Sequence, residues 1–137
     1  METLTRAKSN GRSGNGVTIL VVEDNPDVAA VAVAMLEELN YHTVTVDSGK
    51  AALNCLSAGT QVDLVFSDVV LPGDLDGLAL AEAIRKRHPH VPVLLTSGYA
   101  RVFSGRHGLP ILRKPYEMEA LAEAIRACLD SRAGGKG

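Results

Sequence analysis

Short runs of apolar and β-branched residues alternate with longer segments of helical period along most of this chain, and the alternation restricts the possible folds. Strands are predicted at residues 17–22, 42–46, 62–67, 91–96 and 111–113. Helices are predicted at residues 26–39, 48–58, 78–87 and 117–132. Strands that alternate with helices favour right-handed crossovers and a parallel sheet. The sequence therefore predicts an α/β fold, with a doubly wound five-stranded sheet inside a three-layer sandwich.

The first predicted helix begins after Asp24-Asn25-Pro26, which supplies capping side chains and a proline suited to a helix start. Asn40 is a plausible stop for this helix. Its helical period places one apolar stripe toward the core, formed by Val28, Val31, Met35, Leu36 and Leu39.

Length and composition indicate one ordinary domain. The chain has 137 residues, of which 46% are apolar, and folding at this length buries roughly two thirds of the unfolded surface. The Gly- and Ser-rich residues 1–16 are predicted to form a flexible arm or linker. The domain is placed at residues 17–132, and residues 133–137 are expected to be a disordered tail. Because only five residues follow Arg132, we expect no separate output domain here.

Charge and hydropathy exclude several classes of protein. A formal net charge of −2 argues against a surface built for nucleic-acid phosphates. No apolar run approaches the roughly 18–20 residues of a membrane span, and residues 1–16 lack the apolar core of a secretory signal. The two cysteines have no metal-ligand spacing, so they are interpreted as reduced packing thiols. We therefore expect a cytoplasmic protein that binds neither nucleic acid nor membrane.

Polar residues follow the ends of four predicted strands. These residues are Glu23 and Asp24, Asp68, Ser97 and Lys114. Because the carboxyl ends of parallel strands share one edge of a sheet, these side chains are expected to converge there. Neighbouring carboxylates repel one another unless a cation or proton offsets their charge. Oxygen-only ligation with open positions fits Mg²⁺.

The remaining groups at this edge complete a site for phosphoryl transfer. Asp68 is the candidate nucleophile, since its carboxylate is already ionised and needs no general base. Mg²⁺, Lys114 and the Ser97 hydroxyl would stabilise the three equatorial oxygens of the transferring group. The resulting acyl phosphate adds charge and acceptor oxygens, which can draw Ser97 and Lys114 into new positions.

These motifs, in this order and each at a strand end, identify a family. The chain resembles the receiver domain of two-component response regulators over residues 17–132. The resemblance rests on Val21-Val22-Glu23-Asp24-Asn25, Asp68-Val69-Val70-Leu71-Pro72, Asp76-Gly77, Leu95-Thr96-Ser97-Gly98 and Lys114-Pro115. It implies a flavodoxin-like sheet with the strand order 2-1-3-4-5.

The resemblance also implies a site and its partners. Asp68 would accept a phosphoryl group from the phosphohistidine of a histidine kinase or a histidine phosphotransfer protein. Mg²⁺ would be bound by Asp24, Asp68 and the backbone carbonyl of Val70, with Glu23 holding a metal-bound water. Ser97, rather than Thr96, would take the switch role because it directly precedes Gly98. The Lys114-Pro115 bond is expected to be cis. Such a protein is a phosphoacceptor signalling domain that catalyses only its own phosphorylation and dephosphorylation.

Two features depart from the usual family pattern. The segment from Tyr99 to Pro110 has only twelve residues, which leaves room for one or two helical turns. The usual aromatic switch position, three residues before Lys114, is Ile111, and Tyr99 is a candidate substitute. This pattern is similar to receivers attached to hybrid histidine kinases or standing alone. Output is expected through protein contact, phosphate relay or phosphate storage.

Three other functions remain to be distinguished. A phosphatase of the haloacid dehalogenase type needs a second Asp two positions after a nucleophile on the first strand, but Pro26 stands two positions after Asp24. A flavin-binding module needs donors for phosphate in its first loop, where Glu23 and Asp24 would repel it. The third is an interaction domain that signals by binding alone, without phosphorylation.

Overall fold

A computed structural model describes residues 16–98 and 109–134 of the chain. Five strands and four helices occur within these residues. The strands are β1 (Thr18–Val22), β2 (His42–Val46), β3 (Leu64–Asp68), β4 (Val93–Ser97) and β5 (Ile111–Arg113). The helices are α2 (Pro26–Glu38), α3 (Gly49–Ser57), α4 (Gly77–Arg87) and α5 (Met118–Gly134). The predicted elements are all present, with ends that differ by one or two residues in most cases.

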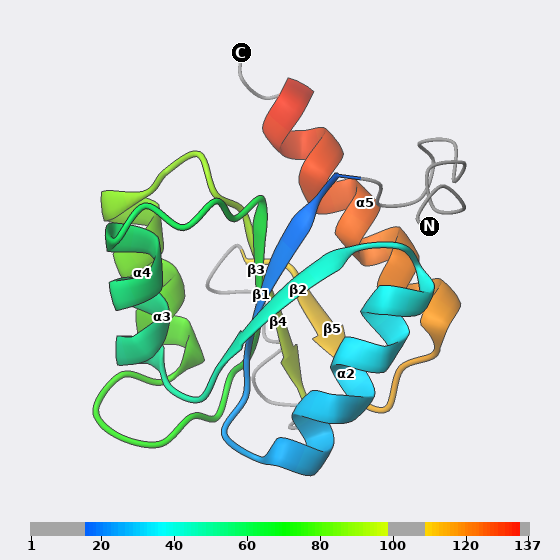
Figure 1. Ribbon diagram of the computed structural model, residues 1–137, viewed down its shortest axis with the longest axis horizontal. Coiled ribbons are helices and arrows are strands. Elements are labelled where there is room, and N and C mark those ends of the chain that lie inside the picture. The colour runs from blue at the N-terminus through cyan, green and yellow to red at the C-terminus, as the bar shows by residue number, and fades with distance from the viewer. Residues whose placement is uncertain (1–15, 99–108, 135–137) are drawn as a thin grey trace, which may run out of the picture.

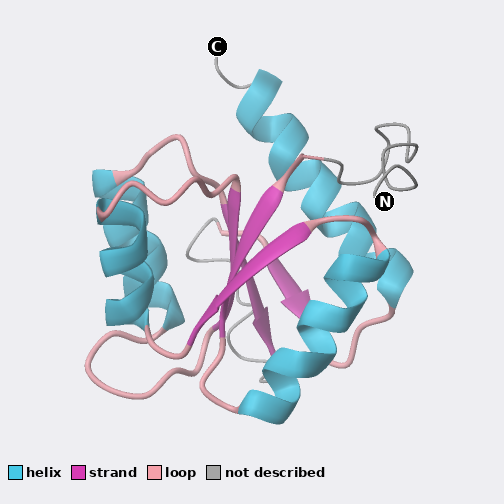
Figure 2. Ribbon diagram, viewed as in Figure 1, coloured by secondary structure: helices cyan, strands magenta, loops and turns pink. Residues whose placement is uncertain are grey.

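The five strands form one sheet in the order β2-β1-β3-β4-β5, and every neighbouring pair is parallel. Helices α3 and α4 cover one face of the sheet, while α2 and α5 cover the other (Figures 1 and 2). This is the predicted three-layer sandwich with the predicted strand order.

Two apolar clusters lie on the two faces of the sheet. Leu95 packs with Leu80 and Ile84 of α4 on one face. Phe66 packs with Leu36 of α2 and Ile125 of α5 on the other. The sheet is therefore apolar on both faces, as is usual for a parallel sheet covered on both sides, and its polar residues are displaced to its edge.

The predicted apolar stripe of α2 is confirmed at Met35, Leu36 and Leu39, which pack in the core cluster, and is wrong at its first two residues. The helix buries Ala29, Ala32 and Leu36, whereas Val28 is 40% exposed and Val31 is 61% exposed. The small alanine side chains face the sheet, which rotates the larger valines outward. A count of apolar residues could not reveal this rotation, because alanine and valine both fit an apolar stripe.

Side-chain caps and a left-handed residue fix the helix ends. The Asn25 side chain accepts hydrogen bonds from the backbone N–H groups of Asp27 and Val28 at 2.9 and 3.1 Å. Asn40 has φ = 70°, in agreement with the predicted stop after α2. At the start of α4, the Asp76 carboxylate accepts from the N–H of Ala79 at 2.9 Å. Both caps lie at the edge of the sheet that carries the predicted site.

Several sequence predictions fall outside the described residues. These are the arm as far as residue 15, the segment 99–108 with Tyr99, and the end of the chain from residue 135. Helix α5 continues to Gly134, two residues beyond the predicted end at Arg132.

Gly77 closes the loop that follows β3. Its N–H donates to the carbonyl of Val69 at 2.8 Å. A Cβ atom at this position would collide with the backbone carbonyl of Asp68 and would lie 2.6 Å from the Cα of Val69. Both obstacles are backbone atoms, which cannot rotate away as a flexible side chain can. Glycine is therefore required here by close packing.

We predict that Gly77→Ala lowers the free energy of unfolding by about 1–3 kcal/mol, because the added methyl group overpacks this loop. Urea denaturation followed by circular dichroism measures the loss. Gly98→Ala is the matched control, since its Cβ would meet only the Lys114 Cβ at 4.0 Å. Equal stability of the two variants would contradict the packing argument.

Candidate functional site

Parallel pairing brings the predicted polar residues to one edge of the sheet. Asp68 is the last residue of β3, and Ser97 is the last residue of β4. Glu23 directly follows β1 and Lys114 directly follows β5. Val22 pairs with Ser67, and Ser97 pairs with Arg113, so each of the four strands ends at the same level. The predicted convergence of Glu23, Asp68, Ser97 and Lys114 is present.

Asp68 contacts donors from two other parts of the site. Its Oδ2 lies 2.8 Å from the ammonium Nζ of Lys114, and its Oδ1 accepts a hydrogen bond from the N–H of Val70 at 3.0 Å. The side chains of Asp68 and Lys114 are 12% and 32% exposed, respectively. Each contact sets a donor against one oxygen of the carboxylate. The Asp68 carboxylate is therefore held from two directions and remains partly accessible.

Glu23 is the buried carboxyl group of the site. Burial is the main cause that raises its pKa, and the N–H of Asn25, which donates to Oε2 at 3.1 Å, opposes the rise. The charge of Asp68 and a hydrogen bond with Asp68 raise the pKa further, while Lys114 lowers it. The negative charge on this side of the site is thus only partly compensated by the protein.

The donor atoms of the site fit a hard divalent cation. Glu23 and Asp68 offer only oxygen ligands, and Asp24 is exposed directly beside Glu23. Among residues 16–98 and 109–134, however, no three acidic, histidine or cysteine side chains are gathered closely enough to hold a metal ion. Glu23 and Asp68 are therefore brought together by the fold, whereas Asp24 is not drawn into a closed cluster with them.

Two adjacent hydroxyl groups end β4. Ser97 is buried, and its backbone carbonyl accepts from the N–H of Lys114 at 3.0 Å. The carbonyl of Thr96 accepts from the N–H of Val69 at 3.0 Å. The Lys114-Pro115 bond is cis, as predicted. Strand β4 is therefore bonded to the backbone on both sides of the site, at Val69 and at Lys114.

Tyr116 belongs to the surroundings of the site, although sequence reasoning did not select it. Its ring lies edge-on to Phe66, with centroids 6.0 Å apart and an interplanar angle of 73°. Burial raises the pKa of the Tyr116 phenol, and the charges of Glu23 and Asp68 raise it further. Its position in the sequence could have indicated this. Tyr116 stands two residues after Lys114, so it belongs to the same turn that presents the lysine.

A search against family models matches residues 19–126 to the response regulator receiver domain. The chain belongs to this family. Among curated relatives, it is 34% identical over 132 residues to the sensor kinase CckA of Brucella abortus, covering 91% of this chain and 14% of the relative. It is 38% identical over 112 residues to the response regulator protein FleR of Pseudomonas aeruginosa, covering 78% of this chain and 23% of the relative. The receiver domain thus spans a minor part of each of these relatives.

Solved structures agree with this assignment. A response regulator receiver protein from Sinorhizobium medicae has a TM-score of 0.77 and 28% identity, over 85% of this chain and 96% of that chain. The response regulator TrrA from Thermotoga maritima, in complex with Mg²⁺ and BeF, has a TM-score of 0.76 and 28% identity, over 82% and 99% of the two chains. The protein is a receiver domain of two-component signalling. In the part of the chain that the structure describes, no helix has the length and hydropathy to cross a membrane.

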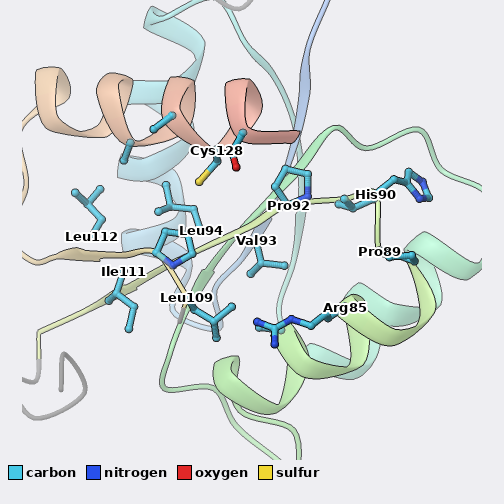
Figure 3. Close-up of a pocket in the computed structure, with 16 residues that line it drawn as sticks. Arg85, Pro89, His90, Pro92, Val93, Leu94, Leu109, Ile111, Leu112 and Cys128 are labelled. Carbon is cyan, nitrogen blue, oxygen red and sulfur yellow. The ribbon is translucent and has the colours of Figure 1, made fainter. Parts of the chain in front are cut away.

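A large and mainly apolar groove of the receiver domain lies away from Asp68. It is open between α4 and α5 beside the beginning of β4, and its lining includes Leu94, Ile111 and Cys128, with Arg85 and His90 among the polar residues (Figure 3). None of the predicted site residues lines it. The groove and the strand-end site are therefore separate features of the domain, and Glu23 and Asp24 line a different, smaller pocket beside α2 and β2.

We predict that Asp68→Asn lowers the pKa of Tyr116, because it removes one of the two negative charges that raise it. The pKa should stay above its ordinary value, since burial is the largest cause of the rise. NMR titration of labelled tyrosine measures the change, and Tyr116→Phe assigns the signal. Asp130→Asn, which removes an exposed charge on α5, should leave the titration unchanged, and an unaltered pKa in Asp68→Asn would contradict the assigned cause.

Proposed function

We propose that Asp68 of this receiver domain accepts a phosphoryl group from a phosphohistidine. The observation that supports the proposal most directly is the ion pair with Lys114, which presents the Asp68 carboxylate at the open edge of the sheet. The N–H of Val70 holds the second carboxylate oxygen, so the side chain is oriented from two directions. A nucleophile that is already ionised and oriented needs no general base.

The reaction exchanges one bond to phosphorus for another. A carboxylate oxygen of Asp68 forms the new O–P bond while the N–P bond of the phosphohistidine breaks, and the electron pair stays on the departing imidazole. The Lys114 ammonium and the Ser97 hydroxyl would stabilise oxygens of the transferring group. Asp68, Asp24 and the carbonyl of Val70 would hold Mg²⁺, with Glu23 acting through a bound water. When bound, the ion supplies positive charge that offsets the carboxylates and the phosphoryl oxygens.

The acyl phosphate would act as a conformational signal. It adds about −1.5 to −2 charges and new acceptor oxygens beside two mobile donors. Lys114 would leave Asp68 for the phosphoryl group, and the buried Ser97 hydroxyl would turn toward it. Because the backbone N–H of Lys114 donates to the carbonyl of Ser97, the movements of the two residues would be coupled. The protein would then be a switch that modifies itself, rather than an enzyme that turns over a small substrate.

The surface around Asp68 suits a protein donor. Val28 and Val31 of α2 and Val70 beside Asp68 are the large apolar side chains exposed in the described residues. Helix α2 begins three residues after Glu23. The exposed Val28 and Val31 therefore lie in the first two turns of the helix, at the end nearest the site. A phosphohistidine-bearing helical domain of a histidine kinase or a phosphotransfer protein could cover them while its histidine reaches Asp68.

The proposed chemistry predicts that incubation with Mg²⁺ and acetyl phosphate adds one phosphoryl group to the wild-type protein. Intact-mass spectrometry measures the addition, and the label should be lost under alkaline conditions, as expected for an acyl phosphate. Asp68→Asn should remove the addition completely, because it lacks the nucleophilic oxygen. Asp130→Asn should react as the wild type does, and modification that persists in Asp68→Asn would reject the assignment.

The proposed metal site predicts that millimolar Mg²⁺ raises the melting temperature of the protein. A ligand at 100 times its Kd stabilises the native state by about 2.7 kcal/mol. Calorimetry suits the measurement, since the chain has no Trp. Asp24→Asn should lose most of the shift and Asp130→Asn should retain it. Equal shifts in the two variants would place the metal elsewhere.

A further inference from the structure

The Thr96 hydroxyl is a buried polar group with no hydrogen-bond partner in the described part of the molecule. Thr96 is 4% exposed, and its Oγ1 is among the few buried side-chain atoms left without a partner. Buried hydroxyl groups are normally paired, because an unpaired one loses its bonds to water and gains nothing in return. Such a group calls for an explanation in the function of the protein.

Strand register places this hydroxyl beside Asp68. Thr96 is the direct partner of Asp68 in the β3·β4 ladder, and in-register residues of neighbouring strands point to the same face. This face carries Phe66 and Leu94 two residues earlier, in the layer of α2 and α5. Ser97, the next residue, therefore points to the opposite face of β4. The strand therefore carries one hydroxyl on each side of the sheet, and the hydroxyl of Thr96 is the one that shares a face with Asp68.

Both oxygens of Asp68 already have donors. Val70 donates to Oδ1, and Lys114 donates to Oδ2. The Thr96 hydroxyl thus lies next to an acceptor group whose oxygens are both engaged. Neighbouring strands are about 4.8 Å apart. Over this distance, a change of the Thr96 rotamer is enough to bring its hydroxyl to the Asp68 carboxylate.

We propose that Thr96 is a second switch hydroxyl, which pairs with Asp68 only in the modified state. The inference rests on the proposed phosphorylation of Asp68. When Lys114 turns to the phosphoryl group, it leaves the carboxyl oxygen that it now contacts. The Thr96 O–H then donates to that oxygen and gains the partner that it lacks in the unmodified protein. Thr96 in this way favours the modified state, and it does so from the face opposite to Ser97.

Beryllofluoride with Mg²⁺ is the probe, since it mimics a phosphoryl group on a carboxylate without chemical turnover. Thr96→Val keeps the shape of the side chain and removes the hydroxyl, Thr96→Ala removes the hydroxyl with a different shape, and Thr96→Ser retains it. We expect both hydroxyl-free variants to bind beryllofluoride three- to tenfold more weakly than the wild type, and Thr96→Ser to bind within twofold. Calorimetric titration measures these affinities.

The unliganded proteins provide the second readout. Without beryllofluoride, Thr96→Val should melt at the same temperature as the wild type or a few degrees higher, since an unpaired buried hydroxyl is removed. A purely structural role predicts the reverse, with a lower melting temperature and an unchanged affinity for beryllofluoride. If both hydroxyl-free variants bound beryllofluoride with wild-type affinity, the inference about Thr96 would be overturned and the proposed function would stand. Failure of the wild type to bind beryllofluoride, with Asp68→Asn behaving identically, would overturn the proposed function as well.

Discussion

The ion pair between Asp68 and Lys114 depends on the parallel order of the strands. The two residues are 46 positions apart in sequence, and they meet because β3 and β5 both pair with β4 and end at the same level. The same register brings Glu23 beside Asp68 from β1. Any slip of one residue in these ladders would turn the polar ends toward the apolar layers. The buried sheet therefore acts as the scaffold that sets the distances between the functional groups.

The site concentrates unfavourable interactions that the rest of the molecule avoids. A buried carboxyl at Glu23, its negatively charged neighbour Asp68 and an unpaired hydroxyl at Thr96 lie at one edge of the sheet. The rest of the three central strands β1, β3 and β4 is mostly apolar. Local conflict of this kind is expected at functional sites, because a bound cation can offset the carboxyl groups and a new acceptor can pair the hydroxyl. The proposed switch would therefore draw on interactions that are unsatisfied in the unmodified protein.

Most of the fold and much of the site could be predicted from the sequence. Alternating strand and helix patterns determine a parallel sheet, and the parallel sheet determines that Glu23, Asp68, Ser97 and Lys114 converge. The orientation of α2 could not be predicted, since Val28 and Ala29 both satisfy an apolar stripe and only packing against the sheet selects between them. The lack of a hydrogen-bond partner for the Thr96 hydroxyl could not be predicted from the sequence either, because it depends on three-dimensional packing.

The strand that presents Lys114 is the least anchored part of the sheet. Strand β5 has three residues, lies at the edge, and pairs with β4 alone. Short edge elements open with a lower free energy than a central sheet does. Transient fraying of this strand would withdraw the ammonium group from Asp68 while the four other strands remained folded. Through such a local opening, the ion pair between Asp68 and Lys114 would break and re-form on a timescale much shorter than that of global unfolding.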